Sequence, residues 1–363
     1  MLIGASLLTP AAVMRPAERP ASRYSDLQLY RNIVDRVAAG QDYYVAAASE
    51  LRTHHYPTYP WAAFRQPWQS MLLAALRTEK ARWLAVAILA IAAIGLSYRA
   101  LAQANVPLPR RMLAIPLIGA GLAAVASPAS PYLHETWSGI LILASLACWR
   151  PGRLGVAVVL GVAACLIRET ALPYPTAMLA FVIFQRRWTE ARAWAVGMAI
   201  FGAALAFHIH LASQQHHTSD LASNGWLKFG GWSFIIAMAH VNPFLDLLPA
   251  AGIALVVGLS ILGFASADNE WMTRVGATVG AFLVTFACVG RPDNSYWGLL
   301  YAPLLPLGLV YADRAVGGLM RAGANSLRQK AAIPGDLGVD AGQPLEHEVP
   351  AVARHGSRSR GVA

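Results

Sequence analysis

Charged side chains in this sequence occur in short groups that separate long apolar runs. Two groups are pairs of adjacent residues, His134-Glu135 and Arg168-Glu169, each in a very short connection between apolar runs. Ionisable residues at a membrane boundary are costly to bury and often mark a site for proton transfer or anion binding. A purely structural reading is equally open, in which Arg168 neutralises Glu169 or Glu135 as an ion pair.

Further polar side chains occur where an apolar run begins or ends. Asp26 lies at the beginning of an amphipathic segment, and Arg291, Asp293 and Asn294 precede the last apolar run. The other members of this set are Asp35, Asp42, Glu50, His216, His217, Asp220 and Asn224. Part of this polarity needs no functional explanation, because loop ends are in contact with water.

The sequence contains no standard catalytic or metal-binding signature. Ser138 stands where the zinc-protease pattern HExxH requires a second histidine, and the GxSxG, Walker A and GxGxxG patterns are missing. Cys148, Cys165 and Cys288 are scattered within apolar runs, so they indicate neither a disulfide framework nor a zinc site. No clear set of metal ligands follows, and a requirement for a divalent metal stays open.

Composition restricts the class of protein that must position these side chains. Of 363 residues, 56% are hydrophobic and 13% are charged, whereas soluble proteins average about 25% charged residues. This balance argues against a soluble two-domain enzyme and excludes a mainly disordered chain. The net charge of +10 is mostly arginine between apolar runs, which is typical of membrane topology rather than of nucleic-acid binding. The sequence therefore predicts an all-α polytopic membrane protein.

The apolar runs predict about ten transmembrane helices, since a spanning helix needs about 20 apolar residues. An uncharged stretch at 1–14 is interpreted as the first span, and segment 232–243 as an interfacial or re-entrant piece. The other runs are 83–104, 112–127, 136–149, 154–168, 171–185, 194–212, 245–265, 275–290 and 296–313. The spans define a transmembrane domain over 1–313, and 314–363 is predicted to be a cytoplasmic, mostly disordered tail.

The positions of the arginines predict the orientation of the spans. With the long loop 15–82 outside the cytoplasm, most basic residues of the short loops fall inside, as the positive-inside rule requires. The inside residues are Arg99, Arg110, Arg111, Arg150, Arg153, Arg186, Arg187, Arg192 and Arg274, and the outside ones are Arg168, Lys228 and Arg291. In this orientation the polar groups described above lie at the outer ends of the spans.

An amphipathic helix is expected over 24–39, within the long outer loop. Its apolar stripe consists of Leu27, Tyr30, Val34 and Val37. Gly40 is a suitable residue to end the helix. Asp26 lies in the first turn, where the helix dipole favours a carboxylate, although Ser25 or Asp26 could equally serve only as an N-cap.

The order of these elements resembles the GT-C superfamily of membrane glycosyltransferases. A first span is followed by an outer loop with an early aspartate, then by an amphipathic helix and a Gly-x-Asp-Tyr-Tyr element. The resemblance is carried by SDLQLY at 25–30, GQDYY at 40–44 and GRPDNSYWG at 290–298, and more weakly by the pairs at 134–135 and 168–169. It covers about 1–313, mostly as architecture. It departs at Leu27, where several relatives have a second acidic residue.

The resemblance implies an integral protein of a bacterial inner membrane with its site on the periplasmic or extracellular face. The reaction would transfer a sugar from a polyprenyl-phosphate donor to a hydroxyl of an unknown glycan, lipid or protein, with inversion and with Asp26 as general base. Membrane lipids would be partners, and nucleic acid would not. The donor's phosphate and sugar would be bound by Arg168, Arg291, His134, Glu135, Glu169, Tyr44 and Asn294. Alternatively, Glu135 and Glu169 could orient the arginine or share a metal ion.

Two other classes of membrane protein stay open. A transporter or flippase for a lipid-linked or polar solute would also place charges near the membrane, although such proteins usually have polar residues or broken helices near the midplane. A non-catalytic scaffold would pair its outer charges with one another and form no cavity. A cavity confined to the outer side favours the enzyme, and a path across the bilayer favours the transporter.

Overall fold

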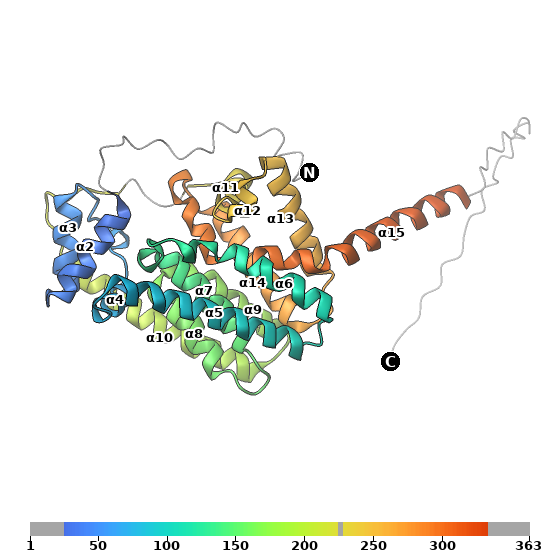
Figure 1. Cartoon of the computed structure of the whole chain (residues 1–363), viewed down its shortest axis with the longest axis horizontal. Coiled ribbons are helices and arrows are strands. Elements are labelled where there is room, and N and C mark those ends of the chain that lie inside the picture. The colour runs from blue at the N-terminus through green and yellow to red at the C-terminus, as the bar shows by residue number, and fades with distance from the viewer. Residues whose placement is uncertain (1–24, 224–227, 333–363) are drawn as a thin grey trace, which may run out of the picture. The chain divides into compact units, whose positions relative to one another are not determined.

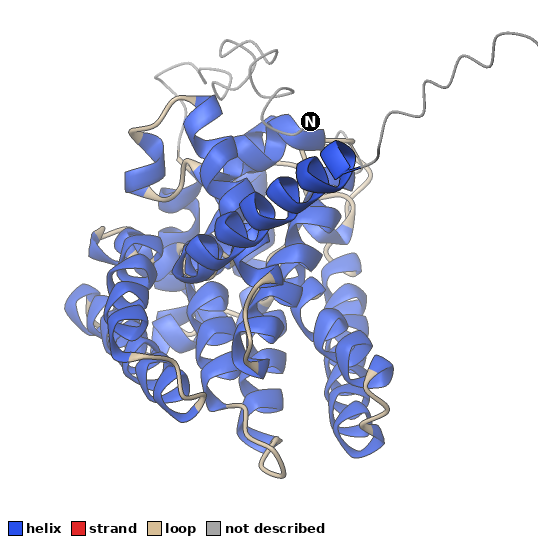
Figure 2. Ribbon diagram, turned by 90° about the vertical axis from the view of Figure 1, so that its right-hand side faces the viewer, coloured by secondary structure: helices blue, strands red, loops and turns tan. Residues whose placement is uncertain are grey.

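The computed structural model describes residues 25–223 and 228–332, and these residues form helices joined by turns, with one isolated bridge between Tyr59 and Ala222 (Figures 1 and 2). The all-α prediction is confirmed for this part of the chain. The described residues up to Gly318 belong to one compact unit, and Leu319 begins a second. The predicted span at 1–14 and the segment 333–363 lie outside the described residues.

The region predicted as an outer loop is itself helical, with α2 (Asp26–Ala38), α3 (Tyr43–Thr53) and α4 (Pro67–Ala75). The amphipathic helix is confirmed as α2, which begins at a Ser25 cap whose hydroxyl accepts from the Gln28 backbone N–H at 3.2 Å. Gly40 follows its end with a φ of +94°, which glycine adopts without strain. The buried face consists of Leu29, Ile33 and Val34, so it is rotated from the predicted stripe.

An ion pair connects α3 to the 214–223 loop. Arg52 donates through Nε and Nη2 to the two carboxylate oxygens of Asp220 at 2.7 and 2.9 Å. The backbone N–H of His217 donates to the same carboxylate at 2.8 Å, and the Asp220 side chain is only 2% exposed. Hydrogen bonding to the Arg52 guanidinium holds the pKa of Asp220 well below its usual range.

This lowered pKa predicts a loss of stability in acid. The pair stabilises the fold fully above the unfolded pKa of aspartate, about 3.9, and the stabilisation is lost as pH falls through the lower folded pKa. We expect Asp220→Asn to reduce the free energy of unfolding at pH 7 by about 1–3 kcal/mol, because charge-assisted hydrogen bonds are lost. Denaturant unfolding in detergent across a pH series measures both effects. Asp246→Asn, at a carboxylate that is 62% exposed, is the control. An Asp220→Asn protein with wild-type acid sensitivity would contradict the assignment.

The centre of the bundle is α7 (His134–Cys148), in which all residues from His134 to Ala147 are buried. A helix that is apolar on every side must be surrounded by others, and α7 packs against α5 (Glu79–Gln103), α8 (Gly155–Ile167) and the 3₁₀ segment η6 (Pro292–Leu300). The other helices are α6 (Leu108–Gly121), α9 (Pro173–Phe184), α10 (Trp188–Ser213), α11 (Gly231–Ala239), α12 (Pro243–Asp246), α13 (Ala250–Ala265), α14 (Glu270–Cys288) and α15 (Ala312–Ala332). The shorter 3₁₀ turns are η2 (Trp61–Ala63), η3 (Ala123–Ala126), η4 (Ser130–Tyr132), η5 (Glu169–Ala171) and η7 (Leu305–Tyr311).

Three of the described helices, α5, α10 and α14, are long and apolar enough to cross a membrane. A fourth span is obtained if the pair Asp293–Leu300 and Leu305–Ser326, bent by 52°, is counted as one. The prediction of about ten spans is therefore not confirmed. Several apolar runs form shorter helices, such as α8 with 13 residues. At 1.5 Å per residue α8 is about 20 Å long, less than the roughly 30 Å of a bilayer core.

The last predicted span, 296–313, is not a continuous helix, and this corrects the prediction. It consists mainly of η6 and η7, and most of its side chains are buried in the bundle. Glycines of the neighbouring helices α7 and α6 allow the backbone of this segment to lie in close contact with them. A Cβ at Gly139 would lie 2.3 Å from the Leu299 carbonyl oxygen, and one at Gly121 would lie 2.2 Å from that of Ala302. Irregular backbone is tolerated in a membrane protein where other protein covers it.

Two predictions about charged segments are also corrected. Residues 314–332 are helical, as part of α15, where a disordered tail was expected. Arg274, expected in an inside loop, lies in the second turn of α14, because this helix begins at Glu270 rather than at 275. The Arg274 side chain is buried and contacts Glu190 at 2.7 Å and Glu270 at 2.9 Å. It therefore connects α14 to Glu190 of α10.

Candidate functional site

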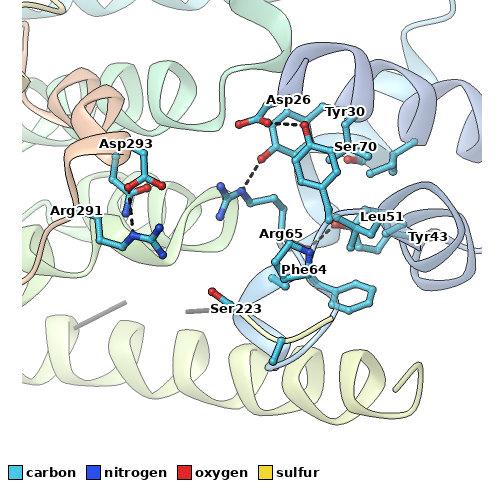
Figure 3. Close-up of a pocket in the computed structure, with 18 residues that line it drawn as sticks. Asp26, Tyr30, Tyr43, Leu51, Phe64, Arg65, Ser70, Ser223, Arg291 and Asp293 are labelled. Atoms are coloured by element: carbon cyan, nitrogen blue, oxygen red, sulfur yellow. Dashed lines mark hydrogen bonds and ion pairs between the residues drawn. The ribbon is translucent and has the colours of Figure 1, made fainter. Parts of the chain in front are cut away.

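A cavity of about 270 Å³ lies where α2 and α3 meet the segment that follows α14 (Figure 3). Asp26 and Tyr30 of α2 line one wall, and Arg291 and Asn294 line another. Arg65, from the short segment between η2 and α4, lies between them. Figure 3 shows the guanidinium groups of Arg65 and Arg291 extending toward each other from two sides. The fold thus brings three of the predicted site residues, Asp26, Arg291 and Asn294, into one cavity.

The position of Asp26 follows from the way α2 begins. Because Ser25 supplies the N-cap, the Asp26 carboxylate is not needed for capping and lines the cavity, half-buried. The Tyr56 hydroxyl donates to its Oδ1 at 2.7 Å. Opposite, Asn294 is buried, and Arg291 donates through Nε to Asp293 at 3.1 Å. This cavity is lined by two carboxylates, Asp26 and Asp293, and by two guanidinium groups, within a volume suited to a small ligand.

Arg65 is the cavity residue that sequence reasoning missed. Its Nε donates to the Tyr30 hydroxyl at 3.0 Å, and its Nη2 donates to the Tyr296 hydroxyl at 3.3 Å. Burial raises the pKa of Tyr30 to about 12, so this phenol is neutral at pH 7. One arginine among many in a long loop carries no distinguishing signal. Its partner Tyr296 is 231 positions away in sequence, and only the tertiary structure joins them.

The hydrogen-bond partners of the Arg65 guanidinium are two phenol hydroxyls. Glu135 and Glu169 act on its charge through space, but among the described residues no carboxylate lies within ion-pair distance of it. A guanidinium has five N–H donors, so donors are left for a ligand. The backbone carbonyl of Arg65 accepts from the Tyr43 hydroxyl at 2.5 Å, which anchors the residue to α3. Arg65 is therefore positioned to bind an anion.

The two adjacent-residue pairs meet in a buried layer beside the cavity. Arg168, with 0% exposure, contacts Glu135 at 2.5 Å and Glu169 at 2.6 Å. The His134 ring packs edge-on against Tyr30, with 5.0 Å between ring centroids. His134, Glu135, Arg168 and Glu169 do not line the cavity with Asp26. The Arg168 charge is already compensated by two carboxylates, as the structural ion-pair reading expected, and Tyr30 connects this layer to the cavity.

Tyr44 and Glu169 each face a different pocket. The Tyr44 hydroxyl contacts His208 Nδ1 of α10 at 3.1 Å and lines a pocket of about 380 Å³ between α3, α4 and α10. Its neighbour Tyr43 lines both this pocket and the Asp26 cavity. Glu169 lies at the edge of a mainly apolar pocket of about 400 Å³ with Phe286 and Trp297. Ala62 of η2 lines this apolar pocket and Ala63 lines the Asp26 cavity, so η2 separates the two.

No group of three or more His, Cys, Asp or Glu side chains within the described ranges is arranged to hold a metal ion. The chemistry available at the cavity is proton acceptance by Asp26 and anion binding by Arg65 and Arg291. No protein-family model matches the chain, and no curated protein or solved structure matches it.

Proposed function

We propose that this chain is a membrane glycosyltransferase that transfers a sugar from a polyprenyl-phosphate donor to a hydroxyl acceptor. The observation that carries the proposal is the Arg65 guanidinium, which donates to two phenol hydroxyls and shares a cavity with Asp26 and Arg291. A cation without a carboxylate in contact suits a phosphate, and the nearby Asp26 carboxylate suits a base for the acceptor.

The proposed reaction is a single displacement. The acceptor oxygen forms a bond to the anomeric carbon as its proton passes to Asp26, and the bond between that carbon and the phosphate oxygen breaks. The phosphate leaves with the electron pair as an anion, which Arg65 and Arg291 stabilise. The anomeric centre is inverted, and no covalent intermediate is required. Asn294 lines the same cavity and offers an amide for hydrogen bonds to the sugar.

The neighbouring apolar pocket supports a lipid-linked donor. Its lining includes Leu172, Pro173, Phe286, Val289 and Trp297, and it adjoins the Asp26 cavity at η2. An isoprenoid chain in this pocket would place its phosphate toward Arg65. The polar cavity is lined by α2, α3 and the segment after α14, and its lining residues belong to predicted outer connections. This position supports an enzyme rather than a transporter.

The class of activity is tested with the purified protein in lipid nanodiscs. A panel of polyprenyl-phosphate sugars is supplied with mixtures of glycan, lipid and peptide acceptors, and release of polyprenyl phosphate is measured together with transfer of labelled sugar. We expect release from at least one donor, coupled to transfer. Absence of release with every donor and acceptor mixture would contradict the proposal.

Arg65→Gln is expected to weaken binding of polyprenyl phosphate by about 10- to 100-fold, because a hydrogen bond to a charged group contributes about 1.5–3 kcal/mol. The dissociation constant of the lipid phosphate in nanodiscs measures this effect without requiring turnover. Arg192→Gln, at an exposed arginine of α10, is the matched control. Equal affinity in the Arg65→Gln and Arg192→Gln proteins would remove Arg65 from the site.

A further inference from the structure

The helix α15 carries a row of arginines on one side. Arg314, Arg321 and Arg328 are spaced by seven residues, so they fall within an arc of about 40° around an axis with 3.6 residues per turn. Between Arg314 and Ala332 the sequence contains no acidic residue. This side of the helix is therefore positively charged along its length.

The opposite side of α15 is apolar and exposed. Val316, Leu319 and Met320 follow the spacing of one helical face and are 39%, 58% and 71% exposed. Gly317, Gly318 and Gly323 lie in the same helix and reduce its intrinsic stability in water by nearly 1 kcal/mol each. A surface that covers the apolar side would stabilise this helix.

The beginning of α15 is attached to the bundle by charged contacts. Asp313 accepts from Arg110 at 2.8 Å, and Arg314 contacts Asp268 at 2.5 Å. The helix directly follows η7, and α15 up to Ser326 forms with η7 the second member of the bent pair that could form a fourth span. The Gly317-Gly318 pair allows a change of direction within this member, so that the helix can turn along the bilayer surface instead of crossing the bilayer.

We propose that α15 lies on an anionic lipid surface, with Val316, Leu319 and Met320 inserted among the acyl chains and with Arg321 and Arg328 directed to lipid phosphates. Helices that lie in the membrane interface combine an apolar side with an arginine-rich polar side, and they are too polar as a whole to span the bilayer. Basic segments next to a span bind anionic headgroups electrostatically. This inference does not depend on the enzymatic proposal, because it concerns a different segment and a different ligand.

Hydrogen–deuterium exchange of the wild-type full chain tests the proposal in nanodiscs of phosphatidylcholine alone or with phosphatidylglycerol. We expect the amides of α15 to exchange at least about tenfold more slowly with the anionic lipid, because the helix is stabilised there. Raising the salt to about 1 M should reverse much of this protection, since the Debye length falls to about 3 Å. Arg321→Gln/Arg328→Gln should reduce the protection in the same way.

A side-specific label distinguishes a lipid surface from another occupant. Cysteine is placed at Met320 or, as control, at Asn325 on the arginine side, in a protein whose Cys148, Cys165 and Cys288 are replaced by Ala. With one copy per anionic nanodisc, the label at 320 should be shielded from an aqueous quencher and the label at 325 should stay accessible. Protection that appears only with two copies per disc would overturn the proposal in favour of self-association. Equal exchange in both lipid compositions would overturn it outright.

Discussion

Asp26→Asn is expected to reduce the rate of sugar transfer by about 10²–10⁴-fold, the usual contribution of a general base. The amide oxygen of the introduced asparagine can still accept the hydrogen bond from Tyr56, and Ser25 still caps α2. The fold should therefore be unchanged. An amide cannot take the acceptor's proton at neutral pH, so the substitution removes the proposed base. The loss should therefore appear in kcat, with the KM of the donor changed much less.

The measurement compares initial rates of transfer by wild type and Asp26→Asn with the donor identified from the panel. Asp246→Asn is the matched control, since it makes the same change at an exposed carboxylate outside the cavity. Affinity for polyprenyl phosphate should be retained by Asp26→Asn, in contrast to Arg65→Gln. If Asp26→Asn keeps full activity while Arg65→Gln loses binding, the proposed glycosyltransferase activity is retained and the base must be another carboxylate.

Arg168→Gln is expected to destabilise the protein by about 3–5 kcal/mol, because removal of one partner leaves buried carboxylates without their counter-ion. Arg168 has no exposed surface and connects Glu135 of α7 with Glu169 of η5, next to the centre of the bundle. Loss of this contact should loosen the packing of α7 against η5. The effect should exceed that of any substitution at an exposed arginine.

Denaturant unfolding of the purified protein in detergent measures this change. Arg168→Gln/Glu135→Gln should recover part of the lost stability, because the second substitution removes one of the uncompensated charges. Arg192→Gln is again the exposed control and should stay within about 0.5 kcal/mol of wild type. Wild-type stability of the Arg168→Gln protein would show that the buried ion pairs do not stabilise the bundle. If the losses of stability from the two single substitutions simply add in the double variant, Glu135 does not depend on Arg168.

Local patterns predicted the local structure well. The spacing of apolar residues, the Ser25 cap and Gly40 define α2 without any tertiary information, because a helix is formed by contacts between residues three or four apart. The breaks between apolar runs likewise correspond to the ends of α7, α8 and α9. Run length did not predict span count. An apolar segment such as 296–313 buries its side chains against neighbouring helices as well as it would against lipid.

The sequence by itself determined that the chain is helical and strongly apolar, and that its polar groups are confined to the ends of apolar runs. Only the tertiary structure decided what each polar group does. Asp26 and Arg291 share a cavity with Arg65, whereas Arg168 is neutralised between two glutamates. The reason is physical: the state of a charge depends on its burial and on the groups within a few ångströms. Those groups come from segments as far apart as Arg65 and Tyr296, whose proximity no local pattern encodes.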